Sequence, residues 1–265
     1  MKIREITTYL EQRFPLSLQE DFDNCGVQCG DIDQEVTSVL VCFEVSDQIL
    51  DEAISLNANL IVSHHPILLK RGICKIEPHD RVGGFICKAL SHGIVLYAMH
   101  TNVDSAKGGG NDVFAEKLGL QNVQVLIPHY ENGKLVQDVG LGRIGELPTP
   151  MKLTDYLHDV KKKLNLKTLR YYGAADQIVR KVAVCGGGGS SFIENALVAG
   201  ADIYITGDIK YHDFFRANRK MAIADIGHYE GEWFIREILY KEITENFTTF
   251  ATAISKMDNL EIFYL

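Results

Sequence analysis

The feature that most constrains the fold is a succession of apolar runs and amphipathic segments that the chain contains twice. The first half reads "VTSVLVCFEV", "SDQILDEAISLNA", "LIVSHH", "DRVGGFICKALSHG" and "IVLYAMH"; the second reads "VRKVAVC", "SSFIENALVAG", "ADIYITGD", "YHDFFRANRK" and "MAIADIGH". Short runs rich in β-branched residues that alternate with helical patterns are typical of α/β proteins. We therefore predict parallel or mixed sheets flanked by helices.

The two successions also align residue by residue. An ungapped offset of 143 positions carries Val39 onto Val182 and Ala58 onto Ala201. A chance match of generic strand and helix patterns is the alternative explanation. If the duplication is real, the fold consists of two related α/β lobes.

The lobe boundaries follow from the segment that joins the two copies. It mixes turn residues with a short apolar run, "LGRIGEL", and leads into the second copy. We predict a first lobe over residues 1–124 and a second over 125–232. The final helical pattern, "EWFIREILYKEITENF", and the strand-like "LEIFYL" are predicted to complete the first lobe with residues 233–265.

Composition narrows the class of protein and its partners. The chain has 265 residues, of which 46% are hydrophobic and 23% charged, as in globular proteins. No apolar run approaches the roughly 18 residues that cross a bilayer, and the charged start lacks a signal-peptide core, so we expect a cytoplasmic protein without a membrane partner. The net charge of -8 argues against nucleic acid. Six cysteines at scattered spacings predict reduced thiols.

Residues with metal-binding chemistry follow the predicted strands. In "LIVSHHP" a strand delivers His64 and His65 to its end, where Pro66 removes a backbone donor and stops the ladder. The third strands of both copies end in H-x3-carboxylate. Ligands gather beyond the carboxyl ends of strands in open α/β sheets. The residues at such ends are His64, His65, His100, Asp104, Asp208, His228 and Glu232.

Imidazole and carboxylate ligands together suit Zn, Fe, Ni or Mn, whereas oxygen ligands alone would suit Mg or Ca. Three histidines and two carboxylates exceed what one tetrahedral metal needs and match two metals that share a bridging carboxylate and water. A single histidine is more often structural, and we interpret four others in that way: His79, His92, His129 and His158.

The glycine-rich segment "VCGGGGSSF" has two interpretations. Bare amides before a helix can hold an anion, and glycines can equally allow a close approach of the backbone to the neighbouring lobe. The segment lacks the lysine of a phosphate-binding Walker loop. The role of Gly186–Gly189 therefore stays open at this point.

Five motifs carry a family resemblance. "DFDNCGVQCGD", "NLIVSHHPIL", "MHTNVDSAKGGGND", "ADIYITGDIKYHD" and "DIGHYEGE" resemble, in order, the signatures of the GTP cyclohydrolase I type 2 homologue family, also called Nif-three-like. The resemblance implies a Nif-three-like fold, a toroidal homohexamer built as a trimer of dimers, and two divalent ions per subunit. It places the metal ligands at His64, His65, Asp104, His228 and Glu232. One departure is Glu44, where the family is expected to have Asp, which puts the role of that carboxylate in doubt.

The resemblance and the two-metal site together imply hydrolysis. With GTP as substrate, hydroxide would attack C8 of the purine and ring opening would release formate. His100 is the candidate acid–base residue; its alternative role is to orient Asp104. Two other functions remain open, a metal-dependent phosphoesterase and a non-enzymatic metal-binding ring that binds partners.

Overall fold

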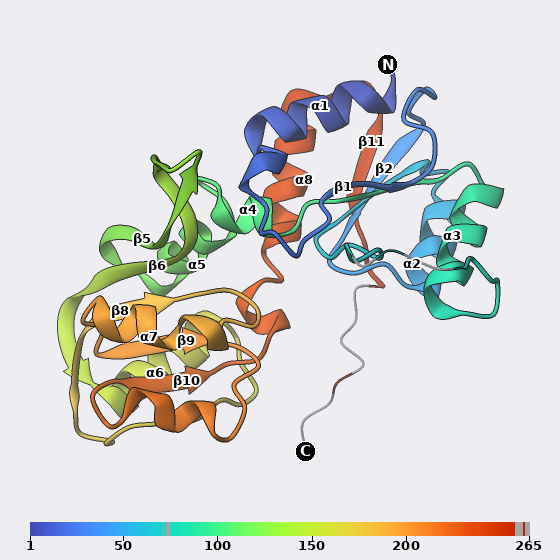
Figure 1. Cartoon of the computed structure of the whole chain (residues 1–265). Coiled ribbons are helices and arrows are strands. Elements are labelled where there is room, and N and C mark those ends of the chain that lie inside the picture. Colours follow the sequence, from blue (N-terminus) through green and yellow to red (C-terminus); the bar gives the residue numbers. More distant parts are fainter. Residues whose placement is uncertain (71, 73–74, 258–261, 263–265) are drawn as a thin grey trace. The chain divides into compact units, whose positions relative to one another are not determined.

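The computed structural model describes residues 1–70, 72, 75–257 and 262 (Figure 1). The chain divides into two compact units. The first comprises Met1–Val103 together with the last helix and strand, and the second comprises Asp104–Phe234. The chain passes from the first unit to the second between residues 103 and 104, before the boundary predicted at residue 124. The reason is that helix α5 (Gly110–Leu118) packs on strand β6 (Lys134–Lys152) of the second unit.

The first unit is built on a five-stranded mixed sheet in the order β1-β4-β3-β2-β11. Strands β2, β3, β4 and β11 run parallel, and β1 pairs antiparallel with β4. In Figure 1, α1 and α8 lie on one face of this sheet and α2 and α3 on the other. The elements are α1 (Ile3–Arg13), β1 (Gly26–Cys29), β2 (Ser38–Cys42), α2 (Asp47–Ser55), β3 (Leu60–Ser63), α3 (Arg81–Ser91), β4 (Val95–Ala98), α8 (Ile235–Asn246) and β11 (Ala251–Ile254).

The central strands of this sheet are short and buried on both faces. All four residues of β3 and all four of β4 are buried, as expected for parallel strands covered by helices on each side. Helix α2 begins at Ser46, whose hydroxyl accepts a hydrogen bond from the Ile49 amide. On the face of the sheet that α2 and α3 cover, the apolar side chains form one core cluster, which includes Leu40, Ile61 and Phe85.

The second unit is built on a six-stranded mixed sheet in the order β5-β6-β8-β9-β10-β7. Strands β8, β9 and β10 are parallel to one another, and β7 pairs antiparallel with β10. The remaining elements are β5 (Gln121–Glu131), α6 (Leu153–Lys163), β7 (Arg170–Tyr172), β8 (Ile178–Val184), α7 (Ile193–Val198), β9 (Ile203–Thr206) and β10 (Ala222–Asp225), with 3-10 turns η1 (Leu16–Leu18) in the first unit and η2 (Ser190–Phe192), η3 (Asp213–Ala217) and η4 (Tyr229–Gly231) in the second.

The two units share one strand succession, which supports the predicted duplication. In both, an antiparallel edge strand is followed by three parallel strands, β1 to β4 in the first unit and β7 to β10 in the second. Even the register repeats: Val39 pairs with Leu60 in one sheet and Val182 with Ile203 in the other. The predicted class of two related α/β lobes with mixed sheets flanked by helices is therefore confirmed.

Helix α8 is followed by β11, which pairs in parallel with β2 of the first unit. The predicted strand "LEIFYL" falls on residues 260–265, of which only Ile262 is among the described residues. Within the described residues, no helix combines the length and apolar character needed to cross a membrane. The five described cysteines are free thiols, and Cys74 lies outside the described residues.

Candidate metal centre

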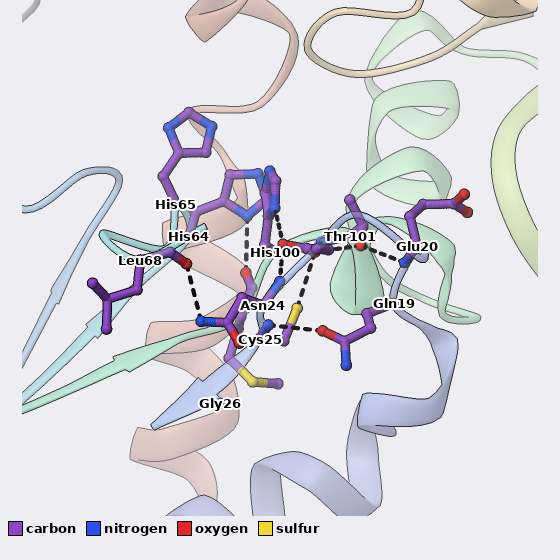
Figure 2. Close-up of polar contacts among 12 residues, drawn as sticks. Gln19, Glu20, Asn24, Cys25, Gly26, His64, His65, Leu68, His100 and Thr101 are labelled. Atoms are coloured by element: carbon purple, nitrogen blue, oxygen red, sulfur yellow. Dashed lines mark hydrogen bonds and ion pairs between the residues drawn. The ribbon is translucent and has the colours of Figure 1, made fainter. Parts of the chain in front are cut away.

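The first unit brings three histidines together at the carboxyl ends of β3 and β4. Ser63 and Ala98 are register partners at the ends of these strands, so His64 and His65 leave the sheet next to His100. One ring nitrogen from each of the three residues lies within 4.8 Å of the others. Figure 2 shows the imidazoles gathered at this edge. Strand adjacency, which the sequence predicted, is thus the reason for this cluster.

The hydrogen bonds of these rings decide which nitrogen each can offer. Nδ1 of the buried His64 lies 2.9 Å from the carbonyl oxygen of Met99. Because a carbonyl only accepts, Nδ1 carries the proton and Nε2 carries the lone pair. Nδ1 of His100 lies 2.8 Å from Oδ1 of Asp23, which fixes that ring in the same way.

The third ring, His65, lies beside Glu44. The His65 Nδ1 is 3.7 Å from Oε2 of Glu44, a distance of an ion pair rather than of a hydrogen bond. Arg81 donates to the other oxygen of Glu44 at 2.9 Å. The ring of Phe43 packs against His65, with centroids 4.5 Å apart. Glu44 therefore stands at the edge of the cluster, beside Nδ1 of His65.

The second unit contains a matching group of an imidazole and carboxylates. Asp208 follows β9 and His228 follows the neighbouring β10, and the η4 turn then carries the chain from His228 to Glu232. Nδ1 of His228 lies 2.7 Å from Oδ2 of Asp208, and its Nε2 lies 3.0 Å from Oε2 of Glu232. Burial lowers the pKa of His228, but Glu232 and then Asp208 outweigh that effect and raise it to about 9.

Asp104 lies close to Glu232 in this unit. It sits in the short helix α4 (Thr101–Ser105) and is only 6% exposed, and Glu232 is 4% exposed. A carboxylate oxygen of each lies within 4.8 Å of the other. Two like charges this close in a desolvated setting repel each other, and a divalent cation is the group that would reverse the cost.

Asn111 links the backbone of Asp104 to the glycine-rich loop after β8. Its side-chain nitrogen donates to the backbone oxygen of Asp104 at 3.1 Å, and its side-chain oxygen accepts from the Gly186 amide at 3.0 Å. Asn111 is buried; its contact with Asp104 is buried too, and its contact with Gly186 is partly buried. This role could not be predicted, because an asparagine in the first turn of a helix has many ordinary roles.

The glycine-rich segment has its explanation in Glu232. A Cβ added to Gly187 would lie 2.2 Å from Oε1 of Glu232, and one added to Gly186 would lie 3.0 Å from its Cγ. Gly187 also has φ +58°, which favours glycine. The loop does make a close approach, but to the carboxylate of Glu232 in the same unit and not to the neighbouring lobe as the sequence interpretation had it.

All four clustered histidines share one arrangement. In each, Nδ1 faces an oxygen, and those oxygens belong to Met99, Glu44, Asp23 and Asp208. Three of these contacts are hydrogen bonds of 2.7–2.9 Å, whereas the His65 contact is 3.7 Å. Imidazole and carboxylate donors together fit a transition metal.

Known proteins are similar to this chain over most of its length. The family model described as Duf34/NIF3 (NGG1p interacting factor 3) matches residues 1–260. The chain belongs to the Duf34/NIF3 family. This confirms the resemblance drawn from the sequence motifs.

Individual relatives of the Duf34/NIF3 family match nearly full length. A Clostridium acetobutylicum protein named GTP cyclohydrolase 1 type 2 homolog is 37% identical over 88% of this chain and 86% of its own. A Clostridium perfringens protein of the same name is 34% identical over 88% and 87%. The crystal structure of a Bacillus cereus protein related to NIF3 matches with a TM-score of 0.90 at 27% identity and covers 100% of this chain and 99% of its own.

The structure groups the residues predicted for the site within each of the two units. His64, His65 and His100 cluster in the first unit, and Asp104, His228 and Glu232 in the second. These groups are capable of binding metal. The sequence analysis missed Asp23 and Asn111 and did not assign a role to Asp208. Asp23 precedes its partner His100 by 77 positions, a distance no local pattern bridges.

Proposed function

We propose that this Duf34/NIF3 protein is a dinuclear-metal hydrolase whose ligands are His64, His65, Asp104, His228 and Glu232. The observation that carries the proposal is the convergence of imidazole and carboxylate donor atoms at strand ends: those of His64, His65 and His100 lie within 4.8 Å of one another in the first unit, and those of Asp104 and Glu232 do so in the second. Glu232, close to both Asp104 and His228, is the candidate bridging carboxylate.

The ligand chemistry supports a first-row transition metal, Zn, Fe, Mn or Ni, because it combines imidazole with carboxylate. Two such ions, when bound, would supply Lewis acidity and lower the pKa of water between them. We propose two ions per subunit, which the five residues have enough donor atoms to hold. Availability rather than ligand type would select among these metals.

The chain's own residues then have separate tasks. The Nε2 of His100 takes a proton from the attacking water and returns it to the leaving nitrogen or oxygen. The nearly buried carboxylates of Asp104 and Glu232 would bind the positively charged ions and hold them in position. Glu44 and Asp208 hold the rings of His65 and His228 in place.

The substrate we propose is GTP, on the strength of the relatives named GTP cyclohydrolase 1 type 2 homolog. Water would add to C8 of the purine and one C8–N bond would break, which opens the imidazole ring to a formamide; a second water would hydrolyse the formamide and release formate. We further propose the homohexamer that the motif resemblance implied. A phosphoesterase and a partner-binding ring remain the competing functions, and the experiment below separates them.

The test measures metal content, oligomer mass and turnover in the same preparations. The variants are His64→Ala and Glu232→Ala. Their matched controls are His92→Ala, whose ring bonds the Lys88 carbonyl on a helix surface, and Glu245→Ala, which is exposed. We expect about two metals per chain and formate release from GTP in the wild type and both controls, and loss of both properties in the two site variants.

Other results would redirect the proposal. Cleavage of bis(4-nitrophenyl) phosphate without formate release from GTP would favour a phosphoesterase. Loss of the oligomer together with the metal, and no turnover by the wild type, would favour a structural metal in a partner-binding ring. A wild type that binds no transition metal would overturn the proposal.

A further inference from the structure

Asp23 is a buried carboxylate in the segment between η1 and β1 of the first unit. Its residue is only 2% exposed. It belongs to the stretch "DFDNCG", which precedes β1 and is remote in sequence from the histidines. The proposed hydrolase assigns no task to it. A buried charge is costly unless hydrogen bonds satisfy it, so its partners show what the position requires.

Five donors converge on this carboxylate, and Figure 2 draws those from Cys25, Thr101 and His100. Oδ1 accepts from the Asn24 amide at 2.7 Å and faces Nδ1 of His100 at 2.8 Å. Oδ2 accepts from the Thr101 amide at 3.0 Å, from Sγ of Cys25 at 3.2 Å and from the Thr101 hydroxyl. Hydrogen bonds to both oxygens hold the carboxylate group in one orientation.

These contacts also decide its charge. Burial raises the pKa of Asp23, but the hydrogen bond and charge of His100, followed by the hydrogen bonds from Thr101 and Cys25, outweigh burial and leave that pKa well below its usual range. An ionised carboxylate only accepts hydrogen bonds. The Nδ1 of His100 must therefore carry a proton, and in the neutral ring the lone pair is on Nε2.

The His100 ring, which Asp23 holds, lies in the histidine cluster of the proposed site. A ring nitrogen of His100 lies within 4.8 Å of ring nitrogens of His64 and His65. The His100 side chain is 19% exposed, whereas the Asp23 side chain is 1% exposed. Solvent thus reaches the imidazole but not the acid that holds it. A carboxylate needed only for packing could bind any donor. Asp23 binds His100, which is partly exposed and is the ring of the cluster that the proposed ligand set leaves out.

We propose that Asp23 is the positioning residue of His100 and holds its ring in the tautomer whose Nε2 accepts a proton. The proposal rests on the hydrolase proposed above and gives its acid–base residue a partner. As the oxygen of water bonds to the electrophilic carbon or phosphorus, its proton passes to Nε2 and the imidazolium is stabilised by Asp23. When the bond to the leaving nitrogen or oxygen breaks, Nε2 returns that proton to it.

The test uses zinc-loaded protein with 15N-labelled histidine and compares wild type with Asp23→Asn. Long-range 1H–15N spectra report which ring nitrogen bears the proton, and the His100 signals are those missing from His100→Gln. Asp33→Asn is the matched control, because Asp33 is an exposed aspartate of the same unit that pairs with Arg4 at 2.7 Å. Metal content and the kcat and KM for GTP are measured on each protein.

We expect the proton on Nδ1 in the wild type and the control, and on Nε2 in Asp23→Asn, whose amide can donate to Nδ1. The kcat of Asp23→Asn should fall on the order of 10² to 10⁴-fold, with KM and metal content near wild type. Asp23→Glu keeps an acceptor and should recover part of kcat. If Asp23→Asn does not fold, the wild-type tautomer and Asp23→Glu still decide.

Three results would overturn the proposal: a wild-type His100 protonated on Nε2, an unchanged kcat in Asp23→Asn, or loss of metal together with activity in that variant. The last result would make Asp23 a support for a metal ligand. A wild type that binds metal but hydrolyses neither GTP nor bis(4-nitrophenyl) phosphate would refute the proposed hydrolase. The tautomer measurement would still decide what Asp23 does.

Discussion

At the scale of single residues, the site depends on which atom each side chain presents. The oxygen facing Nδ1 of His64 leaves its Nε2 to the proposed metal, whereas Nε2 of His228 lies 3.0 Å from Glu232 and would exchange that contact for the ion. Because a metal ion and a proton bind the same ring nitrogen, they compete for it. Carboxylates that raise the pKa of an imidazole prepare it for a cation, but they also strengthen its hold on a proton.

Metal affinity should therefore depend on pH through His228. Its pKa is raised from 6.5 to about 9, so at neutral pH the metal-free ring is protonated and the metal must displace that proton. Affinity should rise by about tenfold per pH unit for each proton released and level off above about pH 9. Competition with a chromophoric chelator between pH 6.5 and 9 measures this.

Asp208→Asn is the informative variant for this dependence. It removes one of the two carboxylates that raise the pKa of His228, so its pH dependence should level off at a lower pH. An affinity that is flat between pH 6.5 and 8.5 in the wild type would contradict the assignment of His228 as a ligand.

A methyl group at Gly187 should also disrupt the site. In Gly187→Ala, the new Cβ would meet the Glu232 carboxylate, so we expect the loss of at least one of the two metals. Gly200→Ala is the matched control, because Gly200 also has positive φ but has no atom within 4 Å of an added Cβ. Both variants should lose roughly 1 kcal/mol of unfolding free energy or more from backbone strain. Retention of two metals at wild-type affinity in Gly187→Ala would disprove the role of the loop.

At the scale of elements, the site is assembled where adjacent parallel strands end and loops meet. Helix α5 contributes through Asn111, which ties the Asp104 backbone to the loop after β8. The link is buried, so removing it leaves polar groups without compensation. Its effect should appear in both stability and metal content.

Asn111→Ala should lower the unfolding free energy by about 1–3 kcal/mol and weaken metal binding by displacing Asp104 or the Gly186 loop. Urea unfolding and metal titration measure the two effects. Asn246→Ala, which removes an exposed asparagine that donates to the Glu242 carbonyl within α8, should change neither by more than a few tenths of a kcal/mol. Equal changes of unfolding free energy and metal affinity in Asn111→Ala and Asn246→Ala would contradict a specific role of Asn111 in the site.

Sequence reasoning succeeded for elements with regular spacing. The strands β3 and β9 and the histidines that follow strands were predictable, because period and chain order place strand ends side by side. Asp23 and the partner of the glycine loop were not, because loop segments carry no periodicity and their contacts join distant positions. The C-terminal strand also escaped prediction: β11 is Ala251–Ile254, ahead of the "LEIFYL" run.

At the scale of the whole molecule, the proposed ligands are divided between the two copies of a duplicated fold. His64 and His65 belong to the first unit, and Asp104, His228 and Glu232 to the second. A ligand that binds only the folded protein stabilises it, so bound metal should stabilise each unit that supplies a proposed ligand.

Chelation should accordingly lower the thermal unfolding temperature of the entire chain. At free metal about 100 times the Kd, bound metal contributes about 2.7 kcal/mol per site. Calorimetry with and without chelator measures the shift, and Glu232→Ala, which lacks a central ligand, should show almost none. A wild-type transition that chelation does not move would argue against metal held across the fold.

The central claim is tested most directly by X-ray absorption at the metal edge of the fully loaded protein. The account predicts imidazole scattering together with a metal–metal vector of about 3.5–4 Å, the spacing of two-metal hydrolytic sites. It also predicts that His65→Ala, on the first unit, and His228→Ala, on the second, each abolish that vector. Isolated metal ions with no metal–metal scattering in the wild type would contradict the claim.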